Sequence, residues 1–228
     1  DRVQEILPEL PSENLLGEPE GRDSLNAVAW SSAVLAHHDP DAVVAVLSAD
    51  HIIEPVDAFQ ASLTEAFEVA EADSDALVTF GVVPTEPHTG YGYLHRGDDV
   101  DGFTHTSQVV EFKEKPSREL AEQYVASGRY WWNSGMFVWR ATTLLEQLRQ
   151  LMPDTHRQVT QLAEHPELLA EIYPTLTKIS VDYAIMEPVS AGRASAHVVA
   201  VALPITWHDV GSFPTLAALM PHDEAGNA

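Results

Sequence analysis

The chain has 228 residues, of which 45% are hydrophobic, and it carries 35 acidic but only 12 basic side chains, a formal net charge of −23. This charge argues against binding nucleic acid, because a duplex-binding protein needs several Lys and Arg residues to neutralise phosphates. The absence of cysteine excludes a disulfide framework, a thiolate nucleophile and a thiolate zinc site. No apolar run reaches the ~20 residues that cross a bilayer, and the N-terminus lacks a signal pattern, so we expect a cytoplasmic protein without a membrane contact.

The first half of the chain alternates helical and strand-like patterns. Ser24 and Asp57 each precede a helical pattern and are predicted to act as N-caps. The continuous apolar run 43–47 is typical of a strand covered on both faces. In chain order, the sequence predicts a helix from Ser24 to His37, a strand over 43–49, a helix over 58–72, a strand over 77–83 and a loop over 84–97.

The second half continues this alternation. The sequence predicts a strand over 108–113, a helix capped by Ser117 and ending near 127, a strand over 136–139, a helix from Thr142 or Thr143 to Pro153, helical structure over 155–173 with a break at Pro166, a strand over 197–203 and a short helix over 214–219. Residues 178–186 stay unassigned. The alternation favours an α/β fold, in which helices cover both faces of a layered sheet.

Two aspartates follow strand-like runs that lie far apart in the chain. Asp50 closes the run 43–49, and Asp209 closes the run 196–203 with its extension to Trp207. Carboxylates at the carboxyl ends of strands face the crevice where open α/β sheets bind ligands, and magnesium sites that handle phosphates take one or two of them. The pair therefore indicates a Mg²⁺ site, although each aspartate taken alone also suits a plain turn or a helix cap.

The segment 111–116, EFKEKP, holds two of the three lysines of the chain. Pro116 predicts that the strand ends here, which frees Glu114 and Lys115 to converge. Lys115 can then bind a phosphate as a compact point charge, while Glu114 accepts hydrogen bonds from sugar hydroxyls. The alternative is a solvated, charged strand edge that protects the sheet from aggregation.

Two glycine-containing segments are further candidates for a sugar site. In TGYGY, residues 89–93, the glycines let the backbone approach a ligand closely, although a plain turn needs no function. In WWNSGMF, residues 131–137, Asn133 is a candidate sugar ligand, whereas core packing explains the aromatic neighbours. The chain has neither a nucleophile elbow nor a Walker phosphate loop, which argues against a serine hydrolase or a Walker ATPase.

Six segments stand in a fixed order along the chain: SADHII, FGVVPTEPHTGYGYL, VEFKEKP, WWNSGMFVWR, ISVDYAIMEP and TWHDVGSF. Together they resemble the mannose-1-phosphate guanylyltransferases, also called GDP-mannose pyrophosphorylases, over nearly the whole chain. The resemblance implies a Rossmann-like nucleotidyltransferase sheet. It also implies Mg²⁺-dependent transfer of GMP from GTP to mannose 1-phosphate, with release of pyrophosphate.

The resemblance also implies roles for individual residues, carried over motif by motif. Asp50 and Asp209 resemble the metal aspartates, and Lys115 resembles the lysine that meets the sugar phosphate, so these three are the candidate catalytic residues. Glu114 resembles the sugar-binding glutamate. The remaining candidates for the sugar pocket are Tyr91, Gly92, Asn133, Gly135 and Asp182.

Two departures from the family pattern affect nucleotide binding. The opening strand and its glycine-rich loop, which would bind the triphosphate with an arginine and a lysine, are missing from this sequence. At residues 22–26 the chain has RDSLN, where many relatives have a Thr-Ala-Pro segment beside the guanine. Arg22, Asp23 and Ser24, which occupy the place of that segment, are the candidate nucleotide-binding residues.

These departures suggest a fragment, truncated at the N-terminus and at the C-terminus, that forms a single nucleotidyltransferase domain over 1–228. We expect the fragment alone to bind GTP weakly and to turn over negligibly, which a turnover assay beside a complete homologue would check. The implied partners are GTP and mannose 1-phosphate, and a homodimer is a further candidate assembly. The alternatives are another sugar-1-phosphate nucleotidyltransferase and a non-catalytic module that binds a sugar nucleotide.

Overall fold

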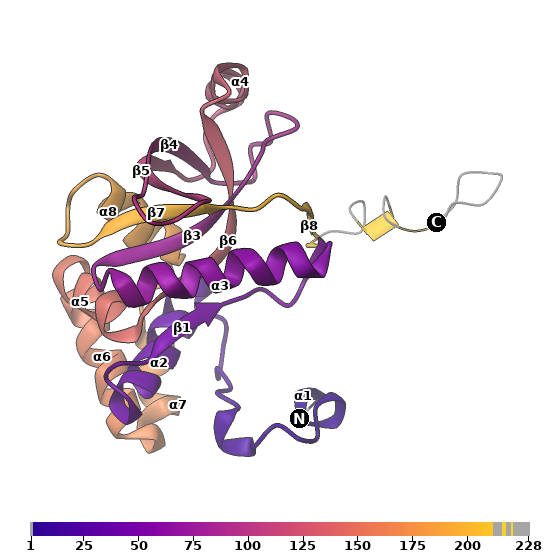
Figure 1. The fold of residues 1–228 in the computed structure, drawn as a ribbon. Coiled ribbons are helices and arrows are strands. Elements are labelled where there is room, and N and C mark those ends of the chain that lie inside the picture. Colours follow the sequence, from indigo (N-terminus) through magenta and orange to yellow (C-terminus); the bar gives the residue numbers. More distant parts are fainter. Residues whose placement is uncertain (1, 212–215, 218–219, 221–228) are drawn as a thin grey trace.

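The structure is a computed structural model, and it describes residues 2–211, 216–217 and 220 (Figure 1). Its main sheet has the strand order β1-β6-β3-β7-β5-β4, and among the described strands only β3 and β7 form a parallel pair. A separate antiparallel ladder joins β2 to β8. The strands are β1 (Val43–Val46), β2 (His51–Glu54), β3 (Ala76–Val82), β4 (Tyr93–Asp99), β5 (Thr106–Lys113), β6 (Tyr130–Arg140), β7 (His197–Ala202) and β8 (Thr206–Asp209).

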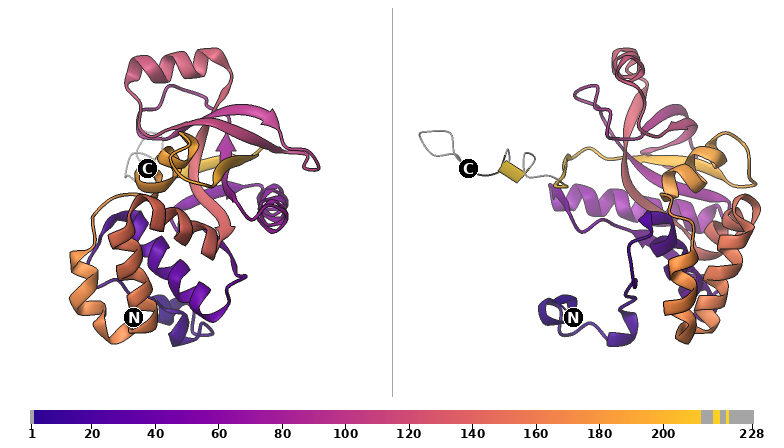
Figure 2. Two further views of the ribbon diagram at one scale, coloured as in Figure 1. Left: turned by 90° about the vertical axis from the view of Figure 1, so that its left-hand side faces the viewer. Right: turned by 180° about the vertical axis from the view of Figure 1, so that it is seen from behind.

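Helices cover both faces of the main sheet, which confirms the predicted fold class. The α-helices are α1 (Arg2–Ile6), α2 (Asp23–His38), α3 (Val56–Ala72), α4 (Arg118–Ser127), α5 (Ala141–Leu151), α6 (Pro153–Glu164), α7 (Leu169–Ile172) and α8 (Glu187–Ser190). Figure 1 shows α3 crossing one face of the sheet, while α2, α5 and α6 pack together on the other, as the first view of Figure 2 also shows. None of the described helices is long and apolar enough to span a membrane.

Two hydrophobic cores follow from the alternation of side chains along the central strands. Leu77 and Val198 are fully buried in the core beneath α2, α5 and α6, whereas their neighbours Val78 and Val199 are buried in the core beneath α3 and α4. Successive residues of a strand point to opposite faces, so a run such as 76–82, buried at every position, requires cover on both sides. The central strands β3 and β7 meet this requirement.

The predicted strand over 43–49 is shorter and less buried than expected. It ends at Val46 and its four residues are only partly buried, because β1 is an edge strand of the described sheet with β6 as its neighbour. Both faces of the strand are nevertheless covered, as predicted, because Val44 and Val46 pack against the core beneath α2, α5 and α6, and Val43 and Ala45 against the core beneath α3 and α4. The following turn leads into β2, which sequence analysis did not predict, and Asp50 lies in that turn rather than at the end of a buried strand.

Several other boundaries also needed correction. Strand β4 begins at Tyr93, within the predicted loop, and β6 begins six residues before its predicted start at 136. Ser24 and Asp57 do not act as the N-caps of α2 and α3, as was predicted. Helix α2 begins at Asp23 and α3 at Val56, so each predicted cap lies inside its helix. Ser117 does cap α4, as predicted, by accepting a hydrogen bond from the backbone N–H of Leu120. The predicted helix over 214–219 lies outside the described residues except for 216–217.

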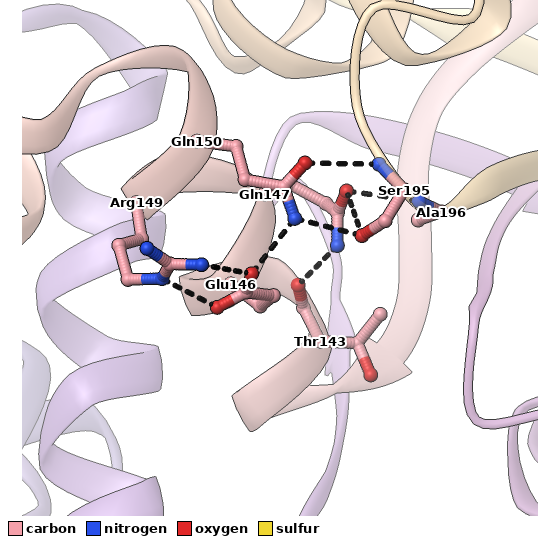
Figure 3. Close-up of polar contacts among 7 residues, drawn as sticks. All are labelled: Thr143, Glu146, Gln147, Arg149, Gln150, Ser195 and Ala196. Atoms are coloured by element: carbon pink, nitrogen blue, oxygen red, sulfur yellow. Dashed lines mark hydrogen bonds and ion pairs between the residues drawn. The ribbon is translucent and has the colours of Figure 1, made fainter.

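Polar side chains of α5 fix the start of β7, the strand that leads to β8 (Figure 3). Gln147 is buried, and its Oε1 accepts a hydrogen bond from the backbone N–H of Ala196 at 2.9 Å. Gln150 Oε1 accepts a second one from the N–H of Ser195 at 3.1 Å. Both N–H groups precede the first residue of β7, and these bonds hold the segment before that strand against α5.

Candidate active site

A cavity of about 550 Å³ collects all the predicted site residues except Arg22. Residues from α2, the turn after β1, the loop before β4, the end of β5, β6, the segment before α8 and the β2–β8 ladder line it. The predicted residues in its wall are Asp23, Ser24, Asp50, Tyr91, Gly92, Glu114, Lys115, Asn133, Gly135, Asp182 and Asp209. Their separation along the chain shows that the site depends on the folded sheet and not on one local motif.

Asp50 and Asp209 meet at the β2–β8 ladder. One oxygen of each carboxylate and one ring nitrogen of His51 lie within 4.8 Å of one another. Asp209 stands directly opposite His51 in the ladder, and the backbone N–H of Val210 donates to the carbonyl of Asp50 at 2.9 Å. Burial lowers the pKa of His51, against the raising effect of the two carboxylates. This group of one nitrogen and two oxygen donors can hold a divalent cation.

Glu114 and Lys115 converge in the cavity, as the strand end at Pro116 predicted. Lys115 Nζ lies 3.2 Å from Glu114 Oε1, and the Glu114 side chain is 6% exposed whereas that of Lys115 is 52% exposed. Burial, and after it the charge of Asp182, raises the pKa of Glu114 to about 7. Lys115 has a φ of +45°, which lifts it out of the extended path of β5. The buried carboxylate and the half-exposed ammonium thus face the same space.

Thr79, Asn133 and Asp182 form a chain of side-chain hydrogen bonds beside the cavity, which we call the amide relay. The hydroxyl of Thr79 lies 2.7 Å from Asn133 Oδ1, and Asn133 Nδ2 donates to Asp182 Oδ1 at 2.9 Å. Burial raises the pKa of Asp182. The pairing of β3 with β6 shifts register next to Asn133, where Gly135 adopts a φ of +73°. A bulge of this kind re-aims side chains, and glycine adopts its left-handed conformation without steric cost.

The start of α2 is hydrogen-bonded to the segment that precedes Asp182. Ser24 does not cap the helix as predicted; instead its Oγ accepts a hydrogen bond from the backbone N–H of Val181 at 3.1 Å. Arg22 does not reach the cavity, because its guanidinium binds the backbone carbonyls of Pro174 and Leu176 and forms an ion pair with Glu20. Of the three predicted nucleotide-binding residues, the structure therefore brings only Asp23 and Ser24 to the cavity.

The cavity is acidic. Five carboxylates line it, from Asp23, Asp50, Glu114, Asp182 and Asp209, whereas Lys115 is the one Lys or Arg among its described lining residues. Phosphate groups would be repelled by such a wall unless a cation offset part of its charge. The composition of the wall therefore favours ligands that arrive with a divalent cation.

Sequence analysis missed two residues of this region. His51 was not predicted as a site residue, although its position directly after Asp50 was a usable signal. Glu187 lies in the short helix α8, outside the cavity lining, and its two oxygens bind Lys113 Nζ at 2.9 Å and the backbone N–H of Glu114 at 3.2 Å. We call these two interactions the Glu187 clamp. The sequence did not predict it, because residues 178–190 show neither a helical nor a strand period.

Comparison with known proteins places this geometry in context. The family described as Nucleotidyl transferase matches residues 3–226. A mannose-1-phosphate guanylyltransferase of Klebsiella pneumoniae is 41% identical over 226 residues, which covers 95% of this chain but 46% of that protein. The chain thus spans about half the length of the curated relatives it matches.

Two solved structures resemble the fold. The first, described as mannose-1-phosphate geranyltransferase from Thermus thermophilus, has a TM-score of 0.78 and 33% identity and covers 92% of this chain and 58% of that one. The second, described as mannose-6-phosphate isomerase from Helicobacter pylori, has a TM-score of 0.68 and 26% identity and covers 84% of this chain and 72% of that one. The shared fold extends over nearly all of the chain.

Proposed function

The chain belongs to the nucleotidyl transferase family, and on this premise we propose that the protein transfers GMP from GTP to mannose 1-phosphate, giving GDP-mannose and pyrophosphate. The observation that carries the proposal is the presence of Asp50 and Asp209 in one cavity with Glu114 and Lys115. The names of the similar proteins support the choice of mannose and guanine. Mg²⁺ as the cation and the cytoplasm as the location are further parts of the proposal.

In this reaction a phosphate oxygen of mannose 1-phosphate attacks the α-phosphorus of GTP, a new P–O bond forms, and the bond to the departing pyrophosphate breaks. Lys115 binds the sugar phosphate as a point charge, and Glu114 accepts hydrogen bonds from sugar hydroxyls. Asn133, with its amide fixed by Thr79 and Asp182, presents a third polar contact to the sugar. The protein supplies position and charge rather than a nucleophile.

The residues of the β2–β8 ladder fit the divalent cation that the reaction needs. Asp50 and Asp209 would hold it, since hard cations in phosphate sites take one or two carboxylates and leave their other positions to phosphates and water. When bound, the cation supplies charge neutralisation for the phosphates. The acidic wall supports this assignment, because Lys115 alone cannot offset the charges of a sugar phosphate and a nucleotide.

Calorimetry with GDP-mannose tests the proposal on the 228-residue protein. We expect binding in MgCl₂, little binding in EDTA, and a loss of at least about tenfold in the Asp209→Asn variant, because the negative charge of one cation ligand is removed. Asp98→Asn, an exposed acid outside the cavity lining, is the matched control and should bind like the parent. Equal binding by the parent and Asp209→Asn would overturn the proposed site.

Other nucleotide sugars separate the proposal from its alternatives. Tighter binding of UDP-glucose than of GDP-mannose would reassign the substrate within the same chemistry. A non-catalytic module would bind GDP-mannose as well in EDTA as in MgCl₂, since it would have no need of the two aspartates.

A further inference from the structure

His51 is the first residue of β2, and it lies beside Asp50, in the turn before β2, and Asp209, the last residue of β8. A ring nitrogen of His51 is within 4.8 Å of a carboxylate oxygen of Asp50 and of one of Asp209. Its Nδ1 is buried and has no hydrogen-bond partner among the described residues. The ring packs edge-on against Trp207, with 5.3 Å between the ring centroids, which restricts its rotation. The fold therefore holds an imidazole next to two carboxylates while one of its nitrogens lacks a protein partner.

The backbone keeps these three donors together. His51 and Asp209 are directly opposite each other in the antiparallel ladder, so their side chains project from the same face. Asp50 immediately precedes His51, and its carbonyl accepts the hydrogen bond from Val210 that extends the ladder by one step. Small adjustments of side chains, without any change of the strands, would bring all three donors onto one ion.

We propose that His51 is a third protein ligand of the cation that Asp50 and Asp209 hold, and that it makes the site prefer Mn²⁺ or Co²⁺ to Mg²⁺. The inference rests on the proposed function, since the cation site is part of it. Mg²⁺ takes oxygen ligands and keeps several of its waters, whereas imidazole nitrogen suits transition metals better. Affinity for a mixed nitrogen and oxygen site rises from Mn²⁺ to Co²⁺, so Co²⁺ should show the larger preference.

The competing explanation is that the His51 ring only fills space against Trp207. A packing role would make substitution of His51 lower stability without changing which cation is bound. A ligand role would change the order of the cations and place a nitrogen in the coordination shell. These two readouts separate the explanations independently of catalytic activity.

The test uses the 228-residue protein without a histidine tag, titrated calorimetrically with MgCl₂, MnCl₂ and CoCl₂. Pulsed electron paramagnetic resonance of the Mn²⁺ complex then reports directly whether a ¹⁴N nucleus is coordinated. The variant is His51→Gln, and the matched control is His208→Gln. His208 lies in the same ladder opposite Ile52, so it projects from the other face. Circular dichroism and urea unfolding establish that each variant is folded.

We expect a ¹⁴N signal in the parent and in His208→Gln, and none in His51→Gln. We also expect His51→Gln to lose about tenfold or more in Co²⁺ affinity and much less in Mg²⁺ affinity, because only the nitrogen ligand has gone. Mn²⁺ bound without a ¹⁴N signal in the parent, but lost in Asp209→Asn, would overturn the role of His51 and leave the proposed function intact. Mn²⁺ bound equally by the parent and Asp209→Asn would overturn both.

Discussion

The side-chain amide of Asn133 donates a hydrogen bond to the carboxylate of Asp182 at 2.9 Å, although the two residues are 49 positions apart in the chain. The other end of the amide faces the hydroxyl of Thr79 at 2.7 Å. Because both ends are engaged, the amide has one orientation, and its contribution to a sugar site is set before a ligand arrives. The relay therefore matters both for stability and for binding.

Replacing Thr79 by valine should lower both the stability of the protein and its affinity for GDP-mannose. Valine keeps the volume but removes the hydroxyl, which leaves Asn133 Oδ1 buried without a donor and costs about 1–3 kcal/mol of unfolding free energy. The freed amide should also weaken GDP-mannose binding about fivefold, the equivalent of one hydrogen bond. Urea unfolding and calorimetry measure the two effects. Ser62→Ala removes a hydrogen bond to the carbonyl of Ala202, outside the cavity lining, and should lower stability only. Unchanged binding by Thr79→Val would contradict the relay.

The clamp made by Glu187 supports a second prediction. Its Oε1 accepts from Lys113 Nζ and its Oε2 from the backbone N–H of Glu114, so one carboxylate fixes the chain just before Lys115. Glutamine at 187 keeps a single acceptor and no charge. We expect Glu187→Gln to lose about 1–2 kcal/mol of unfolding free energy and to bind GDP-mannose more weakly, because the backbone that carries Lys115 is less constrained.

The exposed pair of Glu122 and Arg118 on α4 provides the control for this clamp. Glu122→Gln removes an exposed ion pair between residues four apart in a helix, so its effect on stability should stay within about 0.5 kcal/mol. Binding of GDP-mannose should be unaffected. If Glu187→Gln behaved in both assays like Glu122→Gln, the proposed positioning of Lys115 through Glu187 would be wrong.

Gly92 lies against the Glu114 carboxylate, and this contact yields a third prediction. A Cβ at position 92 would lie 2.6 Å from Glu114 Oε2, so alanine must push that carboxylate aside. Calorimetry should show weaker GDP-mannose binding by Gly92→Ala, and urea unfolding should show some loss of stability, because the new Cβ would also lie 3.2 Å from the Cβ of Asn133. In a Glu114→Ala background the same substitution should have a smaller effect on binding, because the shortest of its contacts has been removed. Gly17→Ala, whose Cβ would meet nothing within 4 Å, is the neutral control.

The sequence predicted the members of the candidate site better than the elements that assemble it. The central strands and the end of β5 at Lys113, shortly before Pro116, were predictable, because long buried runs and a proline give strong local signals. The four-residue strand β2 was missed, since four residues carry too little periodicity to identify a strand. Its pairing with β8, which brings Asp50 and Asp209 together, is a tertiary contact between distant segments.

The unassigned segment 178–186 is a second part of the site whose structure could not be predicted from the sequence. It ends in a π-helical turn, Asp182–Met186, which continues directly into α8. Such a turn matches neither the helical nor the strand period, and it is this turn that carries Asp182 to Asn133. The burial of Glu114 could not be predicted either, because an EFKEKP segment also suits an exposed strand edge.

That burial leads to the last prediction, a dependence of stability on pH. Burial and the charge of Asp182 raise the pKa of Glu114 from its ordinary value of 4.5 to about 7 in the folded protein. Between these values the folded state binds more protons than the unfolded state, so the contribution of Glu114 is fully present below pH 4.5 and is lost as pH rises through 7. The loss is roughly 3 kcal/mol, from the size of the shift.

The Glu114→Gln variant tests this dependence, because its side chain stays neutral at every pH. As pH rises from about 5 to 8, the unfolding free energy of the parent should fall relative to that of the variant. Urea unfolding across this range measures the difference, and Glu122→Gln should instead follow the parent at every pH. A constant difference between Glu114→Gln and the parent would show that Glu114 is charged in the folded protein throughout.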